Sequence, residues 1–154
     1  MEKEFRVYTI MYHGISEEGD NQLTINVKDF EKQISFFKEN YLCPDPKQLI
    51  EDYKSGQEKN DTKDTILITF DDGYEDNFRL ARPILKKYGL KAIVFLISGY
   101  IGENNDWNHK YPKKIRHMNL KEIKESKDVF YFGCHTKNHY QLMTYLLFLT
   151  VYTH

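Results

Sequence analysis

The stretch Thr65-Ile-Leu-Ile-Thr-Phe-Asp-Asp-Gly73 decides the fold class of this chain. Its first six residues carry no charge and lie between polar residues, which is typical of a strand buried on both faces of a sheet. A second run of this kind, Ala92-Ile-Val-Phe-Leu-Ile97, follows after one helix-length segment. Buried strands that alternate with helices pair in parallel through crossover connections, so the pattern predicts an α/β fold.

The rest of the chain continues this alternation. We expect two more strands, over 5–12 and 129–132, and a turn-rich connection over 14–21. Apolar spacing and capping residues predict four helices, over 27–40, 46–54, 75–88 and 119–126. A strand–helix unit takes about 30 residues and a closed eight-unit barrel about 250. The 154 residues therefore form a single domain, 1–154, that is short for a complete barrel.

Composition excludes several classes of partner. The 22 basic and 23 acidic residues give a net charge of -1, which argues against binding to nucleic acid or to an anionic membrane. The longest apolar stretch, 142–152, is about half the ~20 residues that a transmembrane helix needs. The amino terminus does not resemble a secretory signal, so a cytoplasmic location is the default expectation.

Two adjacent carboxylates, Asp71 and Asp72, follow the first buried strand. Active sites of parallel α/β folds collect at the carboxyl ends of strands, where loops converge above a rigid sheet. Gly73 permits a sharp bend that can bring both carboxyl groups to one cavity. The alternative is that the two residues only form a turn and cap the next helix.

Two histidines, His135 and His139, follow the last predicted strand. At a spacing of four they share one face if the segment is helical, although such a pair is also common by chance on surfaces. A carboxylate and two imidazoles at the same end of a parallel sheet supply three metal ligands and leave positions open for water. The remaining carboxylate can then act as a general base.

These residues carry a family resemblance. Thr69-Phe-Asp-Asp-Gly73 and His135-Thr-Lys-Asn-His139 resemble, in order, the first two motifs of the polysaccharide deacetylases of the NodB-homology family, carbohydrate esterase 4 type. Three flanking stretches resemble the branch that acts on poly-N-acetylglucosamine: Met11-Tyr-His-Gly-Ile15, Asp72-Gly-Tyr-Glu-Asp-Asn77 and Gly89-Leu-Lys-Ala-Ile-Val-Phe-Leu96. The resemblance covers residues 5–142.

The resemblance implies a distorted (β/α) barrel and the hydrolysis of N-acetyl groups from an amino-sugar polymer. By position in the family's motifs it makes Asp71 the catalytic base, and Asp72, His135 and His139 the ligands of a divalent metal. Zinc is the default from these ligand types, with cobalt, nickel or manganese as alternatives. The family mostly works outside the cytoplasm.

The chain also departs from the family pattern. The family's later motifs, including the one with its acid histidine, have no counterpart after His139, and residues 142–154 form an atypical tail. We therefore interpret the chain as a C-terminally truncated member with an incomplete barrel. The alternative function is a catalytically impaired metal- or sugar-binding remnant of such an enzyme.

Three further residues are candidates for substrate binding. His13 follows the first strand and either faces the same cavity or is a buried, hydrogen-bonded histidine. Tyr74 and Trp107 offer aromatic faces on which a sugar ring can stack, although Trp107 equally suits a partly buried anchor. The basic segment 110–116 is interpreted as a solvated face.

Overall fold

A computed structural model describes residues 6–18, 23–56, 63–106 and 114–139 of the chain. Its centre is a parallel sheet of four strands in the order β1-β4-β5-β6. The strands are β1 (Val7–Tyr12), β4 (Thr65–Phe70), β5 (Ala92–Leu96) and β6 (Phe130–Cys134). Each pair of neighbours is parallel. The predicted α/β class is confirmed, and within the described part of the chain the sheet is open, with β1 and β6 at its edges.

The helices agree with the capping residues in the sequence. They are α1 (Val27–Asn40), α2 (Pro46–Ser55), α3 (Arg82–Lys87) and α4 (Leu120–Glu125), with a short 3-10 turn at Ser98–Tyr100. Asn26 caps α1 through its side chain, and Gly56 ends α2 in the left-handed conformation. Asn119 and Glu122 form a capping box at the start of α4. None of the helices in the described ranges has the length and apolarity to cross a bilayer.

Two local features differ from the sequence-based expectation. The helix expected over 75–88 contains a π-helical turn, Asn77–Ala81, before α3 begins at Arg82. The segment expected to be only a turn-rich connection contains a short strand, β2 (Gly14–Ser16), which pairs with β3 (Thr24–Asn26). Three-residue strands show no measurable alternation, so the sequence could not reveal them.

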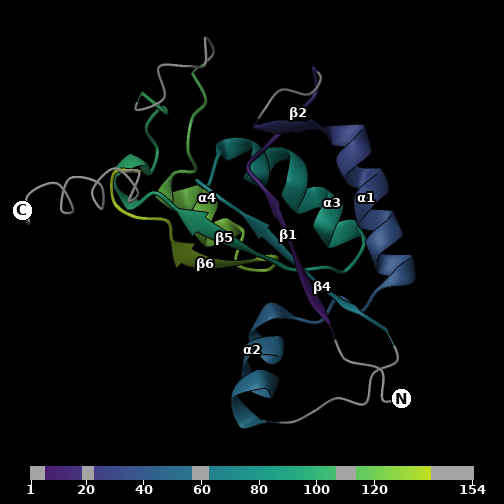
Figure 1. Cartoon of the computed structure of the whole chain (residues 1–154). Coiled ribbons are helices and arrows are strands. Elements are labelled where there is room, and N and C mark those ends of the chain that lie inside the picture. The colour runs from purple at the N-terminus through teal and green to yellow at the C-terminus, as the bar shows by residue number, and fades with distance from the viewer. Residues whose placement is uncertain (1–5, 19–22, 57–62, 107–113, 140–154) are drawn as a thin grey trace, which may run out of the picture.

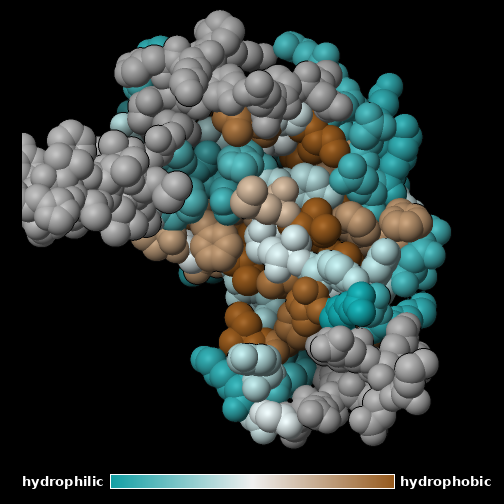
Figure 2. Space-filling model, in the orientation of Figure 1, coloured by the Kyte–Doolittle hydropathy of each residue, from teal (hydrophilic) through white to brown (hydrophobic). Residues whose placement is uncertain are grey.

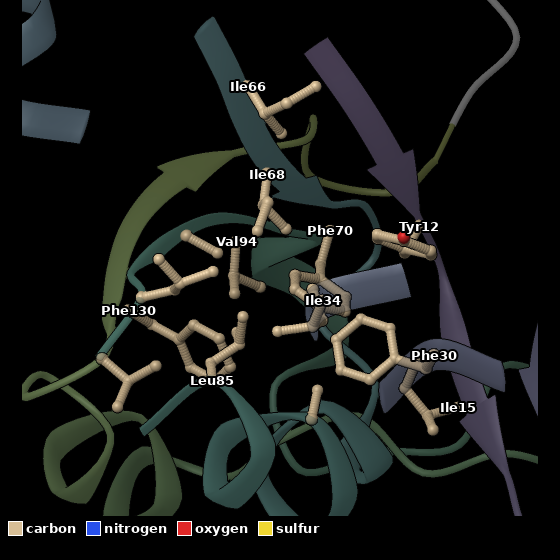
Figure 3. Packing of buried hydrophobic residues seen from close by; sticks show 14 of the residues in the cluster. Tyr12, Ile15, Phe30, Ile34, Ile66, Ile68, Phe70, Leu85, Val94 and Phe130 are labelled. Carbon is tan, nitrogen blue, oxygen red and sulfur yellow. The ribbon is translucent and has the colours of Figure 1, made fainter. Parts of the chain in front are cut away.

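The hydrophobic core lies between one face of the sheet and helices α1 and α3 (Figures 1 and 3). Phe30 and Ile34 of α1 and Leu85 of α3 are fully buried against Phe70 of β4 and Val94 of β5. Helix α2 lies near the amino ends of the strands in Figure 1, where its capping residue Asp45 pairs with Lys91 at 2.9 Å. The core thus holds the sheet in place, while loops form the surface at the carboxyl ends of the strands.

Candidate metal centre

Strand register brings the two predicted motifs to one edge of the sheet. Phe70 of β4 is paired with Val94 of β5, and Leu96 of β5 with Cys134 of β6. The residues that follow β4 and β6 therefore emerge at the same edge, on either side of β5. The His135 N–H donates to the Leu96 carbonyl at 2.7 Å, so the pairing between β5 and β6 continues to the first histidine.

Asp72 turns toward this edge because the chain bends sharply after β4. Asp72 and Gly73 both have positive φ, 68° and 70°. The positive φ at position 73 favours glycine, and a Cβ there would also force the end of the Leu96 side chain to shift. The Asp71 N–H donates to the Tyr12 carbonyl at 2.8 Å and ties the start of the bend to β1.

The histidine segment is a turn and not a helix. Thr136 and His139 have positive φ, 61° and 54°, and the His139 N–H donates to the Thr136 Oγ1 at 3.0 Å. The Gly99 N–H donates to the Lys137 carbonyl at 2.9 Å and fastens the turn to the loop after β5. The two histidines are therefore brought together by a turn, and the shared helical face that the sequence left open is not the arrangement found.

The carboxylate and the two imidazoles form a compact cluster. The Oδ1 atom of Asp72 lies 3.6 Å from the Nε2 atom of His135 and 3.4 Å from the Nε2 atom of His139. The three ligand atoms all lie within 4.8 Å of one another. Ligands about 2.1 Å from a tetrahedral zinc ion are separated by about 3.4 Å, so the spacing suits one small cation.

Burial also fits a metal ligand. The Asp72 side chain is only 1% exposed, whereas those of His135 and His139 are 35% and 26% exposed. The Asp72 Oδ1 has no hydrogen-bond partner among the residues that the structure describes. A buried carboxylate oxygen without a donor is costly, and a cation held jointly with two imidazoles would compensate for it. The half-exposed imidazoles leave the opposite side open to solvent.

The other predicted site residues have different surroundings. Asp71 is half-buried directly before the cluster, at the end of β4. His13 is half-buried after β1, and its carbonyl accepts from the Asn77 Nδ2 at 2.8 Å. Trp107 and the tail 142–154 lie outside the described residues. The base role of Asp71 and the substrate role of His13 stay predictions.

Tyr74 does not offer the stacking face predicted for it. Its side chain is fully buried, and its ring packs against His117 with the ring centroids 4.9 Å apart. Burial, together with the nearby Asp72 carboxylate, raises the pKa of the Tyr74 phenol. The sequence places Tyr74 beside a catalytic motif but does not reveal that the sharp bend turns its side chain inward.

His117 also lies in this region, although the sequence did not mark it as a site candidate. It is 2% exposed, and its Nδ1 lies 2.9 Å from the backbone carbonyl oxygen of Asp72. Burial lowers the pKa of His117, opposed by the hydrogen bond to Asp72. No motif marks His117, because it reaches the site from the segment before α4. Its position in a polar stretch next to a basic run was the only signal available.

Comparison with known proteins identifies related chains. A family model described as polysaccharide deacetylase matches residues 58–147. The protein named putative polysaccharide deacetylase YxkH from Bacillus subtilis is 36% identical over 115 residues, which cover 74% of this chain and 40% of the relative. A poly-beta-1,6-N-acetyl-D-glucosamine N-deacetylase from Staphylococcus aureus is 31% identical over 137 residues, covering 86% of this chain and 43% of the relative. The chain thus spans less than half of the length of these curated relatives.

Solved structures share the fold. IcaB from Ammonifex degensii superposes with a TM-score of 0.71 at 23% identity, over 88% of this chain and 55% of that structure. The Streptococcus pyogenes deacetylase PplD, solved in complex with acetate, superposes with a TM-score of 0.67 at 28% identity, over 92% of this chain and 60% of that structure.

Proposed function

Because the chain belongs to the polysaccharide deacetylase family, we propose that it is a metal-dependent hydrolase that removes N-acetyl groups from an amino-sugar polysaccharide. The observation that carries this proposal is the cluster of Asp72, His135 and His139 around one cation-sized space. The donor set of one carboxylate and two imidazoles favours zinc, with cobalt, nickel or manganese as alternatives.

Backbone strain supports the assignment of this cluster as the functional site. Among the described residues, the non-glycine residues with positive φ are Asp72, Thr136 and His139. All three lie in the two loops that meet at the cluster. Strained conformations persist only where the surrounding structure enforces them, and they concentrate at functional sites. The strain here places ligand side chains that regular strand or helix geometry would direct elsewhere.

The chain's own residues divide the chemical work. Asp72, His135 and His139 would hold the cation, and the exposed side of the two imidazoles would admit the acetamido group of the substrate. When bound there, the cation would supply Lewis-acid chemistry, polarising the acetyl carbonyl and lowering the pKa of water. Asp71, adjacent to the cluster and half-buried, accepts the proton of the attacking water.

The name of the Staphylococcus aureus relative suggests the first substrate to test. Oligomers of β-1,6-linked N-acetylglucosamine would be compared with chitin oligomers, and acetate release would be measured with and without zinc. Zinc-dependent release supports the deacetylase proposal. Zinc binding without release from either polymer would support the alternative of a metal- or sugar-binding remnant.

Two substitutions separate the proposed roles. Asp71→Asn should lower acetate release about 100- to 10,000-fold and leave zinc affinity unchanged, because a general base is lost and a ligand is not. His135→Ala should weaken zinc binding by more than about 100-fold, measured by competition with a chelator. Asp29→Asn, on the exposed face of α1, serves as the matched control. Retained acetate release in Asp71→Asn would reject Asp71 as the base.

A further inference from the structure

The backbone of Asp72 is clamped from outside its own loop. The segment before α4 runs antiparallel to the bend after β4, with a bridge between Tyr74 and His117. The Met118 N–H donates to the Gly73 carbonyl at 2.9 Å, and the Glu75 N–H donates to the Arg116 carbonyl at 2.8 Å. These two bonds fix the bend on either side of Tyr74, and His117 supplies the bond to Asp72 itself.

The hydrogen bond from His117 to Asp72 has a defined direction. A carbonyl oxygen can only accept, so the His117 Nδ1 at 2.9 Å carries the proton and donates it to Asp72. The carbonyl belongs to the same residue whose carboxylate faces His135 and His139. Holding this carbonyl therefore holds the left-handed conformation, φ 68°, that directs the Asp72 side chain to the cluster.

His117 is itself firmly placed. Its ring packs against Tyr74 and Tyr100, with ring centroids 4.9 Å and 5.8 Å apart. Its N–H donates to the Glu103 carbonyl at 2.9 Å. The preceding Arg116 makes two bonds to the Glu122 carboxylate, at 2.6 Å and 3.0 Å, within the capping box of α4. The donor to Asp72 is thus anchored to a helix start and to an aromatic stack.

Packing alone does not account for a histidine at this position. The His117 Nε2 is buried and has no hydrogen-bond partner in the described part of the chain. A buried acceptor without a donor destabilises a protein, so a phenylalanine of similar shape would suit a purely structural role better. What histidine adds is the Nδ1 donor to Asp72.

We infer that His117 is a positioning residue of the metal centre, which uses its Nδ1–H to hold the main chain of Asp72 in the conformation that binds the cation. The inference rests on the proposed function only in requiring that Asp72, His135 and His139 bind a divalent cation. Residues that orient metal ligands typically change metal affinity 10- to 100-fold when they are substituted.

Two variants distinguish this role from packing. His117→Phe keeps the ring and loses the donor, whereas His117→Asn loses the ring but keeps an N–H donor near the position of Nδ1. We expect the zinc dissociation constant to rise about 10- to 100-fold in His117→Phe and by less than about 5-fold in His117→Asn. Without metal, the thermal midpoint of His117→Phe should be higher than that of His117→Asn. The order of stabilities would then be the reverse of the order of zinc affinities.

Zinc itself is the probe, with affinity measured by chelator competition at a temperature where all variants are folded. Cobalt(II) absorption spectra then report whether the coordination geometry changes. Phe130→Leu, a buried core substitution at the start of β6, controls for a general loss of stability. It should lower the thermal midpoint and leave zinc affinity within about 3-fold of wild type.

Three outcomes would overturn the inference. Unchanged zinc affinity in His117→Phe would remove the positioning role and leave the proposed metal centre intact. If the zinc affinities of all three variants simply follow their thermal midpoints, His117 contributes through packing alone. Zinc binding by the wild-type chain no tighter than by Asp72→Ala would reject the metal centre, and with it both proposals.

Discussion

Asp72 brings together two unfavourable features in one residue. It has positive φ, 68°, and a carboxylate that is 1% exposed with an Oδ1 that lacks a hydrogen-bond partner in the described ranges. Each of these features destabilises the metal-free protein. A cation held by Asp72 and the two histidines would compensate for the buried charge, so the proposed metal centre would couple metal binding to folding stability.

This coupling predicts the effect of Asp72→Asn. Asparagine keeps the shape and tolerates positive φ, but it removes the buried negative charge. Without metal, the variant should be more stable than wild type by about 1–3 kcal/mol, or about 2–12 °C in the thermal midpoint. Added zinc should raise the midpoint of wild type only. Thermal scans with zinc or with a chelator measure both effects, and an equal zinc-dependent rise in the variant would contradict the assignment of Asp72 as a ligand.

Asp76 gives a second prediction at the scale of one residue. Burial raises the pKa of its carboxyl group to about 7, and the neighbouring Glu75 adds to the effect while Arg79 opposes it. The unfolded chain loses this proton near its ordinary pKa of about 3.9. Between about pH 4 and pH 7 the folded state therefore binds more protons than the unfolded state, and the free energy of unfolding decreases as the pH rises.

Asp76→Asn removes that pH dependence. The free energy of unfolding of the variant, minus that of wild type, should increase by up to about 4 kcal/mol between pH 4 and pH 7. Urea denaturation in the presence of a chelator, repeated across this pH range, measures the difference. A difference that does not change with pH would show that Asp76 is not protonated in the folded protein at pH 5–6.

At the scale of elements, the site depends on the contact between the loop after β5 and the histidine turn. A Cβ placed on Gly99 would lie 2.5 Å from the Lys137 carbonyl oxygen and 2.9 Å from the Asn138 Oδ1. Gly99→Ala should therefore push the turn away and raise the zinc dissociation constant about 10-fold, with little change in secondary structure. Ser98→Ala, next to it, keeps the backbone bond to Thr136 and should bind zinc like wild type. Equal affinities in the two variants would show that this contact does not position the histidines.

The helices, strands and loops differ in how far a sequence can predict them. The strand at 65–70 and the helix at 27–40 were predicted with the observed bounds, because apolar runs and an Asn cap are local signals. Parallel strands that end at one edge predicted that a carboxylate would meet the two histidines, and the family resemblance implied that it is Asp72, which lies beside His135 and His139 in the structure. The backbone conformation that brings these side chains together was not predictable, since positive φ at Asp72, Thr136 and His139 comes from contacts between loops distant in sequence.

The residues that were missed or assigned wrongly depend on such long-range contacts. Tyr74 was expected to face the substrate, but the bend at Asp72 and Gly73 turns it into a stack with His117. His117 belongs to no motif and reaches Asp72 across 45 positions of sequence. Local sequence patterns do not indicate which of many polar residues contacts a loop that is distant in sequence. The residues that hold the site in place are therefore identified only from the three-dimensional structure.

At the scale of the whole molecule, the helices of the described ranges cover the two faces of the sheet unequally. Parallel sheets are normally covered on both faces. Here α1 and α3 cover one face, while on the other face of β1 Val7 and Met11 are 45% and 55% exposed. Figure 2 shows apolar side chains gathered over the middle of the molecule on the side that it presents. Strand β1 is also an edge of the described sheet, so its outer backbone groups can pair with another chain.

An apolar face beside an open strand edge predicts that the 154-residue chain self-associates at micromolar concentrations. Met11→Lys places a charge on this face and should shift sedimentation profiles toward the monomer without changing zinc affinity. Phe36→Lys is the matched control, because Phe36 is 52% exposed on α1, which covers the opposite face. It should leave self-association unchanged. A wild-type chain that sediments as a monomer at every concentration, or equal effects of the two lysines, would show that the β1 face does not drive association.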